Sequence, residues 1–344
     1  MRSTATLQEF LPRLMRAEHL SRVEASRLLE CLLDGEATDA QIAATLIALK
    51  NKGETVEELA GLAEAMRARA TPIRCDHARF IDTAGTGSSA AKTFNVSTAA
   101  AFVIAGAGLP VAKHGNRAAS SRCGSADVLS ALGVNVQAEP AISEKCLNSI
   151  GICFMFAPLY HGATARVAGV RRELGVHTTF NLLGPLTNPA RAPRQIIGVW
   201  DRALIEPLAH TLALLGTEHA WVVHGGDGLD EITIADSTFV AEAKNGEVRT
   251  FEIQPEDFGL ERTSLEGLRG GDAEENASII RSVLSGDRRD AARSLVLINA
   301  AAALFVGRAA RDLREAMRLA EESIDSGRAS EKLDELIRIT NTSD

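Results

Sequence analysis

Two loops that contain glycine lie close together in the sequence, and each follows a short apolar run. The first is Gly85-Thr86-Gly87-Ser88-Ser89, and the second is Lys113-His114-Gly115-Asn116-Arg117. Side chains that can donate hydrogen bonds follow both loops: Thr93, Asn95, Ser97 and Thr98 after the first, and Ser120, Ser121 and Ser125 after the second. Glycine lets backbone N–H groups approach a ligand closely, and the N–H groups that start a helix carry partial positive charge. This pattern predicts a site that binds anions.

Positive side chains near the second loop fit the same prediction. Lys113, Arg117 and Arg122 can neutralise a polyanion. Each feature also has an ordinary explanation, because a Gly-Thr-Gly run is often only a turn, Asn95 and its neighbours can cap a helix, and His114 can be a plain loop residue. Two strand–loop–helix units of the same kind, close in sequence, favour a phosphate site over these alternatives.

A second group of candidate residues lies between positions 151 and 189. Tyr160 and His161 follow an expected strand. Three arginines lie on or beside a helix expected over residues 167–174: Arg166, Arg171 and Arg172. Arginine can bind a carboxylate through two parallel hydrogen bonds, so a small carboxylate ligand is one interpretation. A solvated basic helix face is the other, and composition alone favours it.

A pair of carboxylates, Asp230-Glu231, follows another expected strand. Mg²⁺ is usually bound by one or two carboxylates together with substrate phosphates and water. An Asp-Glu pair is also common on protein surfaces, so the pair alone is weak support for a metal site.

These motifs, taken together, resemble those of the anthranilate phosphoribosyltransferase family. That family carries GTGGD, TFN(I/V)ST, KHGNR and S(S/G)(K/R)SGSAD in this order, and the present chain has GTGSS, TFNVST, KHGNR and SSRCGSAD. The family's YH step, its following arginine, its TxFNxLGPLxNP segment and its GxDE element are also matched, so the resemblance covers nearly the whole chain. The chain departs from the family at Ser88 and Ser89, where Gly-Asp is usual, and at Cys123, where Ser is usual. The missing aspartate leaves the number of bound Mg²⁺ ions open.

The resemblance implies a reaction and the residues that carry it out. The reaction is transfer of the phosphoribosyl group of phosphoribosyl pyrophosphate to anthranilate, a step of tryptophan biosynthesis, with Mg²⁺ as cofactor. The residues implied for phosphoribosyl pyrophosphate are Gly85, Thr86, Gly87, Ser88, Ser89, Thr93, Asn95, Ser97, Thr98, Lys113, Asn116, Arg117, Ser121 and Ser125. Those implied for anthranilate are Gly85, Asn116, His161 and Arg171, those for catalysis are His114, Arg171 and His161, and those for the metal are Ser97, Asp230 and Glu231. Which histidine, if either, accepts the amine proton stays open.

Three other functions are compatible with parts of the pattern. A phosphoribosyltransferase for another aromatic amine would explain the Ser88-Ser89 departure. A pyrimidine nucleoside phosphorylase shares the expected architecture, but its usual KHS-TGG phosphate loop is absent from this sequence. A nucleic-acid-binding relative would need a basic surface groove, and the net charge of −8 argues against one.

The first 70 residues read as a bundle of short helices. Four sites pair a capping side chain with Glu or Gln three residues later: Thr6/Glu9, Ser21/Glu24, Thr38/Gln41 and Thr55/Glu58. Gly35 and Gly53 stand where helices are expected to end. No residue here is an obvious chemical group, so we expect a scaffold, which the resemblance identifies as the contact of a homodimer.

From residue 80 onward, expected strands alternate with expected helices, which indicates a mostly parallel sheet. The expected strands are 80–83, 110–113, 151–156, 195–200 and 220–224, and Asn245-Gly246 predicts a hairpin turn between two further strands. The fold class is therefore α/β, with a small N-terminal α-helical domain and a larger α/β domain whose central sheet is flanked by helices. We expect the domains to span 1–72 and 78–344, joined by a segment near 165–190 in which the resemblance puts Gly184-Pro185 near a hinge.

Composition sets limits on location and partners. The 344 residues include 45% hydrophobic residues, enough for a packed core. The five cysteines, Cys31, Cys75, Cys123, Cys146 and Cys153, are odd in number and scattered, which is typical of reduced thiols. The N-terminus lacks an apolar run of signal-peptide length, and residues 99–112 are too short to cross a bilayer. We expect a cytoplasmic protein without a membrane or nucleic-acid partner.

Overall fold

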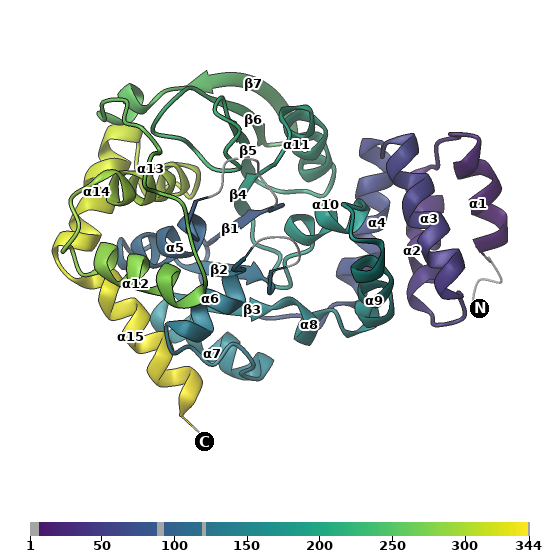
Figure 1. Cartoon of the computed structure of the whole chain (residues 1–344), viewed down its shortest axis with the longest axis horizontal. Coiled ribbons are helices and arrows are strands. Elements are labelled where there is room, and N and C mark those ends of the chain that lie inside the picture. Colours follow the sequence, from purple (N-terminus) through teal and green to yellow (C-terminus); the bar gives the residue numbers. More distant parts are fainter. Residues whose placement is uncertain (1–6, 88–92, 119–121, 343–344) are drawn as a thin grey trace.

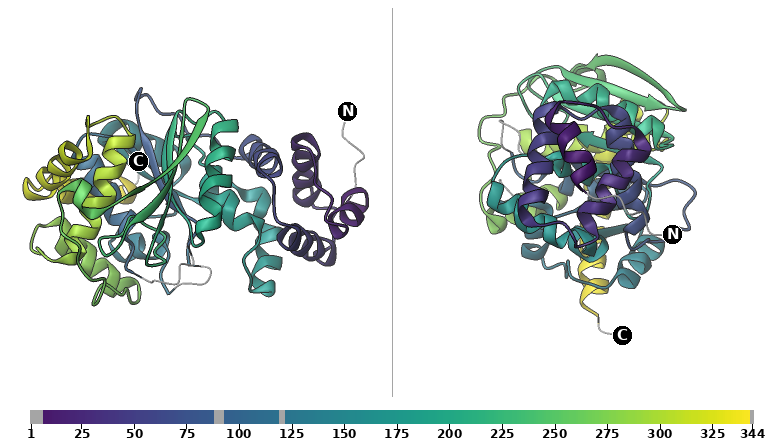
Figure 2. Two further views of the ribbon diagram at one scale, coloured as in Figure 1. Left: turned by 90° about the horizontal axis from the view of Figure 1, so that it is seen from above. Right: turned by 90° about the vertical axis from the view of Figure 1, so that its right-hand side faces the viewer.

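The structure is a computed structural model that describes residues 7–87, 93–118 and 122–342. It consists of a small N-terminal helical domain and a larger α/β domain built on one sheet, as the sequence predicts (Figure 1). The N-terminal helices occupy one end of the molecule, and the C-terminal helices occupy the other (Figure 2). No helix in the described part of the chain is long and apolar enough to span a bilayer.

Short helices make up the N-terminal domain: α1 Leu7–Met15, α2 Arg22–Leu33, α3 Asp39–Lys52 and α4 Val56–Arg69. At Ser21, Thr38 and Thr55 the cap side chain accepts a hydrogen bond from the third helical residue, whose own side chain accepts one from the cap backbone. These three expected capping boxes are therefore confirmed. The fourth, at Thr6, lies outside the described residues.

The α/β domain contains a seven-stranded sheet in the order β3-β2-β1-β4-β5-β6-β7. Its strands are β1 Ile81–Gly85, β2 Val111–Gly115, β3 Ile152–Phe156, β4 Arg194–Gly198, β5 His219–Gly225, β6 Thr238–Lys244 and β7 Glu247–Ile253. Strands β1 to β5 are parallel to one another, and the β5–β6 and β6–β7 pairs are antiparallel. The five expected parallel strands are confirmed to within two residues at each end. Asn245 and Gly246, both with positive φ, form the expected hairpin turn between β6 and β7.

Helices cover both faces of the sheet and divide the core into two parts. Alternate residues of a strand point to opposite faces, and accordingly Ile196 belongs to one core and Ile197 to the other. The first core contains α5 Val96–Gly106, α12 Ala273–Leu284, α13 Ala291–Val306, α14 Leu313–Asp325 and α15 Arg328–Asn341. Asn299 of α13 is a satisfied core amide, as expected, because it exchanges hydrogen bonds with the backbone of Ile232.

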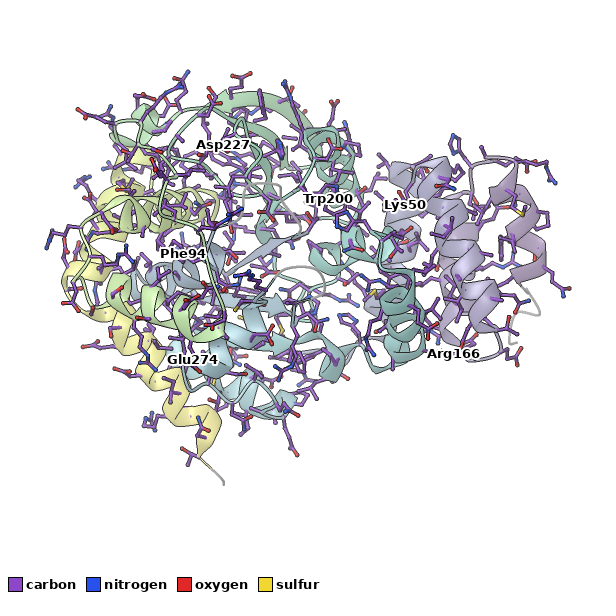
Figure 3. The ribbon with its side chains drawn as sticks, viewed as in Figure 1. Lys50, Phe94, Arg166, Trp200, Asp227 and Glu274 are labelled. Atoms are coloured by element: carbon purple, nitrogen blue, oxygen red, sulfur yellow. The ribbon has the colours of Figure 1, made fainter. Side chains whose placement is uncertain are left out.

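The second core continues from the sheet into the helical domain. It includes α9 Ala165–Leu174, α10 Thr179–Leu186 and α11 Ile205–Leu214 together with leucines of α2, α3 and α4. Gly184 and Pro185 lie in the last turn of α10, a helix within the segment predicted to join the domains. Figure 3 shows Lys50 of the helical domain and Trp200 of the α/β domain on the two sides of this junction. The remaining helices are α6 Ser125–Ala131, α7 Pro140–Ile150 and α8 Ala157–Tyr160.

Candidate active site

The carboxyl ends of the parallel strands meet at one edge of the sheet, and both glycine-bearing loops leave from that edge. The aligned ends are Gly85 with Gly198 and Gly115 with Phe156. In parallel sheets with helices on both faces, ligands bind beyond this edge. The strand order therefore brings together two loops that the sequence predicts to bind the same anion.

Thr86 anchors the first loop to the neighbouring strand. Its backbone N–H donates to the carbonyl of Gly198 at 2.9 Å, and its hydroxyl accepts from the N–H of Trp200 at 3.3 Å. Gly87 has a φ of +67°, which favours glycine at this position. Ser88 and Ser89 lie outside the described residues.

The side chain of Lys113, in the second loop, contacts residues on both sides of the first loop. Its buried ammonium group donates to the carbonyl of Thr83 on β1 at 2.5 Å and to the hydroxyl of Ser97 on α5 at 3.4 Å. Burial lowers the pKa of Lys113, and the charges of Asp82 and Glu231 oppose that shift. Lys113 therefore lies between β1 and the first turn of α5, where the N-terminus of the helix adds partial positive charge.

Ser97, Asp230 and Glu231, the predicted metal ligands, converge at this same place. The backbone N–H of Ser97 donates to Oε1 of Glu231 at 3.2 Å. Oδ2 of Asp230 lies 3.7 Å from where a Cβ on Gly85 would be. Burial, with the nearby charge of Asp230, raises the pKa of Glu231 to about 8. A buried carboxylate whose ionised form is disfavoured by a second, adjacent carboxylate fits a site for a divalent cation, because the cation favours the ionised form.

A metal site here would draw on few protein ligands. The described residues contain no group of three or more His, Cys, Asp or Glu side chains arranged to hold a metal ion. Mg²⁺ commonly takes its remaining ligands from substrate phosphates and water. The donor set at Ser97, Asp230 and Glu231 therefore fits Mg²⁺ that binds together with a phosphorylated substrate.

Gly198, which the sequence analysis did not single out, makes room for the carboxylate pair. A Cβ at this position would lie 1.7 Å from the carbonyl oxygen of Asp230.

We expect Gly198→Ala to displace Asp230, lower turnover and reduce the free energy of unfolding by about 1–3 kcal/mol. Denaturant unfolding and turnover measure the two effects. Gly169→Ala, in α9 with no atom within 4 Å of the new Cβ, is the control and should be at least as stable as wild type. Wild-type stability and turnover in Gly198→Ala would contradict this role.

Asp127 shapes the second loop. Its carboxylate accepts hydrogen bonds from the N–H groups of Ala118 and Gly124, both at 2.9 Å, and pairs with Arg117 at 2.8 Å. The carbonyl of Asn116 accepts from the hydroxyl of Ser125 at 3.3 Å. The loop is thus closed by a residue that the sequence analysis did not name, although it is the last letter of the SSRCGSAD motif. Ser121 lies outside the described residues.

The residues at the start of α5 differ in their burial and in their hydrogen-bond partners. Asn95 occupies the N-cap position without a side-chain capping bond, and its amide instead bridges the carbonyl of Cys123 and the side chain of Asn276. Thr98 is buried, and its hydroxyl has no partner among the described residues. Thr93 is half-buried, and its carbonyl lies next to Gly270. Asn95 therefore ties the two loops to α12, which carries Asn276, a contact that local spacing did not predict.

His114 and His161 form a buried pair whose ring centroids lie 5.1 Å apart. Nδ1 of His114 is 3.2 Å from the carbonyl of Gly184, and Nε2 of both imidazoles is buried without a partner among the described residues. Burial lowers the pKa of His114 to about 3, with a contribution from His161, and lowers the pKa of His161 to about 4. Both imidazoles are therefore neutral at pH 7.

Arg171 and His114 both contact residues of α10. Arg171 donates to the side chain of Asn181 at 3.2 Å, and its guanidinium lies 5.4 Å from the ring centre of Phe180. Burial lowers the pKa of Arg171. Asn181 and Gly184 are three residues apart and so share one face of α10. That helix face, which the sequence analysis missed, brings Arg171 and His114 together.

The buried histidines should make the protein less stable in acid. Their folded-state pKa values lie below the 6.5 of an exposed imidazole, so the unfolded chain binds protons first as the pH falls. Stability is fully present above about pH 6.5 and declines toward pH 4, by up to ~1.4 kcal/mol per pH unit for each group. Between about pH 7 and 4.5, His161→Asn should lose roughly 2 kcal/mol less than wild type in denaturant unfolding. His210→Asn, at an exposed position on α11, should behave like wild type. Equal acid losses in all three proteins would contradict the assignment.

The chain matches known protein families in both its helical domain and its α/β domain. The family model described as the glycosyl transferase family α/β domain matches residues 77–330, and that of the family's helical bundle domain matches residues 8–70. The anthranilate phosphoribosyltransferase of Moorella thermoacetica is 52% identical over 331 residues, which cover 96% of this chain and 97% of that protein. The anthranilate phosphoribosyltransferase of Anaeromyxobacter sp. (strain Fw109-5) is 52% identical over 334 residues, which cover 97% of this chain and 98% of that protein.

Solved structures agree with these relatives. The anthranilate phosphoribosyltransferase of Thermus thermophilus superposes with a TM-score of 0.91 at 39% identity, covering 96% of this chain and 99% of that one. The Saccharomyces cerevisiae enzyme in complex with PRPP and Mg superposes with a TM-score of 0.88 at 29% identity, covering 98% of both chains.

Proposed function

The chain belongs to the anthranilate phosphoribosyltransferases, and from that premise we propose how its residues perform the reaction. The enzyme transfers the phosphoribosyl group of phosphoribosyl pyrophosphate to the amine of anthranilate and releases pyrophosphate, a step of tryptophan biosynthesis. The observation that most directly supports the proposed residue roles is the contact of Ser97 with Lys113 and Glu231, beside Gly85.

A direct assay tests the function. Anthranilate is fluorescent, so its fluorescence should fall when the protein is mixed with phosphoribosyl pyrophosphate and Mg²⁺. A mixture without the phosphoribosyl donor is the control. Unchanged fluorescence in the complete mixture would overturn the proposed function. Faster turnover with a different aromatic amine would show that this amine, and not anthranilate, is the preferred acceptor.

On the donor side, the two loops and the start of α5 bind phosphoribosyl pyrophosphate. Buried positive charge from Lys113, the helix N-terminus and backbone N–H groups stabilise the leaving pyrophosphate. Arg117 keeps half of its side chain exposed while paired with Asp127 and can meet a phosphate. The full donor set is Gly85, Thr86, Gly87, Ser88, Ser89, Thr93, Asn95, Ser97, Thr98, Lys113, Asn116, Arg117, Ser121 and Ser125.

Mg²⁺ would be held by Ser97, Asp230 and Glu231. The raised pKa of Glu231 supports this, because burial and the adjacent charge of Asp230 both disfavour its ionised form until a cation binds. When bound, Mg²⁺ would neutralise charge on the pyrophosphate that leaves. The S. cerevisiae neighbour was solved with PRPP and Mg, which agrees with a cation at the donor site.

On the acceptor side, Arg171 binds the carboxylate of anthranilate, and His161, Asn116 and Gly85 border its path to the ribose. Breaking the anomeric C–O bond leaves positive charge on the ribose, so holding the weakly basic amine in line matters more than a strong base. The neutral imidazoles of His114 and His161 each have an Nε2 atom without a partner among the described residues, and either can accept the amine proton as the new C–N bond forms.

The domains are residues 1–72 and 78–344, joined by the segment near 165–190, and their relative movement closes the site over its substrates. Trp200 should report on this movement because its ring packs at a tilt against that of His177, with ring centroids 4.5 Å apart. His177 in turn lies within range of the charge of Lys50 in the helical domain. Tryptophan fluorescence should therefore change when both substrates bind. A spectrum unaffected by substrates would argue against closure at this junction.

The protein acts as a cytoplasmic homodimer through the helical domain. Met15 and Val23 of that domain keep 75% and 69% of their surface exposed, as at an uncovered interface. The five cysteines form no disulfide in the described part of the chain, which suits a reducing compartment. Light scattering on the purified protein should give twice the mass of the 36.6 kDa chain. A monomer mass would refute the dimer.

A further inference from the structure

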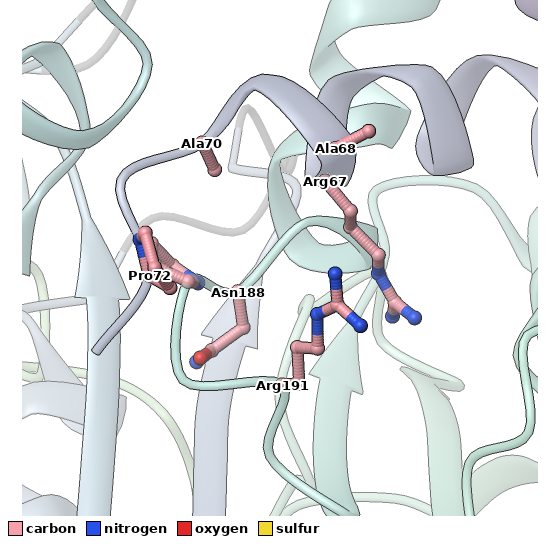
Figure 4. Close-up of a pocket in the computed structure, with 7 residues that line it drawn as sticks. Arg67, Ala68, Ala70, Pro72, Asn188 and Arg191 are labelled. Carbon is pink, nitrogen blue, oxygen red and sulfur yellow. The ribbon is translucent and has the colours of Figure 1, made fainter. Parts of the chain in front are cut away.

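A cavity of about 170 Å³ lies where the end of α4 meets the loop before β4. Arg67, Ala68, Ala70 and Pro72 line it from the helical domain and linker, and Asn188, Pro189 and Arg191 line it from the loop. Its volume is many times the ~10–15 Å³ that one water molecule needs. Figure 4 shows Arg67 and Arg191 extending toward each other across the cavity.

The two arginines bring positive charge into this cavity without a matching carboxylate. Arg67 is half-buried, and its Nε donates to the carbonyl of Leu186 at 2.7 Å, which leaves its terminal nitrogens for another partner. Neither guanidinium forms an ion pair with the described residues. Glu64, whose charge acts on Arg67, is itself paired with Arg22. Burial and then the charge of Arg191 lower the pKa of Arg67 to about 10. Two like charges that face each other without an anion destabilise this site.

The cavity is separate from the candidate active site. The loop that carries Arg191 leads into Arg194, the first residue of β4, and so lies toward the amino edge of the parallel strands. The donor loops leave from the opposite, carboxyl edge. None of the residues that line the cavity belongs to the donor, acceptor or metal sets.

We propose that this cavity is a second anion site, in which a phosphate or phosphate monoester bridges Arg67 of the helical domain and Arg191 of the α/β domain. Guanidinium groups bind phosphate through paired, charge-assisted hydrogen bonds. The occupant would join the two domains at the end of α10. That helix also carries Gly184, whose carbonyl contacts His114.

Thermal unfolding of the full-length protein in inorganic phosphate tests the site, with sodium chloride keeping ionic strength constant. Arg191 has a φ of +51°, so Arg191→Asn removes the charge while keeping a residue that tolerates this backbone. Arg308→Asn is the matched control, because Arg308 is also exposed, has a φ of +57° and does not line the cavity. In about 20 mM phosphate, wild type and Arg308→Asn should show the same rise in Tm, and Arg191→Asn should lose at least about half of it.

The donor site also binds phosphates, so the KM for phosphoribosyl pyrophosphate is measured in all three proteins. It should stay within about twofold of wild type, which assigns the lost rise to the cavity. A second titration with ribose 5-phosphate tells whether the site prefers free phosphate or a phosphate monoester. The preferred ligand is the one for which Arg191→Asn loses more of the rise in Tm. An undiminished rise in Arg191→Asn with both ligands would overturn the proposal.

A structural measurement checks the position. Crystals soaked in selenate, which scatters anomalously and mimics phosphate, should show a peak within hydrogen-bond distance of both Arg67 and Arg191. Anomalous peaks confined to the loops at Gly85 and Lys113 would overturn the second site while leaving the proposed function intact.

Discussion

Replacing Glu231 with glutamine should lower Mg²⁺-dependent turnover by about 100-fold or more. Glutamine has the same shape and can still accept the hydrogen bond from the N–H of Ser97, so the loop should keep its place. The substitution removes one of the two charges that we propose as ligands of the cation. It also removes repulsion with Asp230, so without Mg²⁺ the variant should be at least as stable as wild type.

Turnover measured over a range of Mg²⁺ concentrations checks this result. Asp230→Asn should show the same kind of loss, with a higher Mg²⁺ requirement. Asp236→Asn is the control, because Asp236 lies in the same loop region but pairs with Arg262 at 3.6 Å, away from Ser97. Unaltered turnover and Mg²⁺ dependence in both Glu231→Gln and Asp230→Asn would show that the metal assignment is wrong.

Arg171→Ala should raise the KM for anthranilate by about 10- to 100-fold, because it removes charge-assisted hydrogen bonds to the carboxylate. The guanidinium is held in place by Asn181 and Phe180, so little ordering is needed when anthranilate binds. The KM for phosphoribosyl pyrophosphate should change by no more than about threefold, since none of the described donor residues contacts Arg171.

Steady-state kinetics with each substrate varied in turn separates the two effects. Arg172→Ala is a close control, because Arg172 is the next residue on α9 but is exposed. It should behave like wild type with both substrates. A larger effect on the donor KM than on the anthranilate KM would move Arg171 to the phosphate side.

Residues close together in the chain were predicted well because neighbours decide local backbone structure. The capping boxes at Ser21, Thr38 and Thr55 each depend on a partner three residues away. The Asn245-Gly246 turn depends on two residues that tolerate positive φ. The parallel strands followed from apolar runs that alternate with helical periodicity, and only their ends shifted by one or two residues.

Several residues that shape the site were missed because their roles depend on distant partners. Gly198 is important because the carbonyl of Asp230 lies where a Cβ would be. Asp127 is important because backbone N–H groups of the second loop donate to its carboxylate. Asn181 is important because it accepts a hydrogen bond from Arg171. The placement of Gly184 in α10 was also missed, since a Gly-Pro step usually ends a helix and here it stands in the last turn.

The sequence by itself predicted the architecture, the two glycine-bearing loops at the ends of parallel strands and, through motif resemblance, the reaction. Only the tertiary structure decided which atoms meet: Ser97 and Glu231 are 134 residues apart and meet because β4 alone separates β1, which precedes Ser97, from β5, which precedes Glu231. The placement of Arg67 and Arg191 around one cavity was likewise invisible in the sequence. The physical reason is that hydrogen bonds and packing within a few residues select helices, strands and turns, whereas the order of strands in a sheet arises from burying apolar faces across the whole chain.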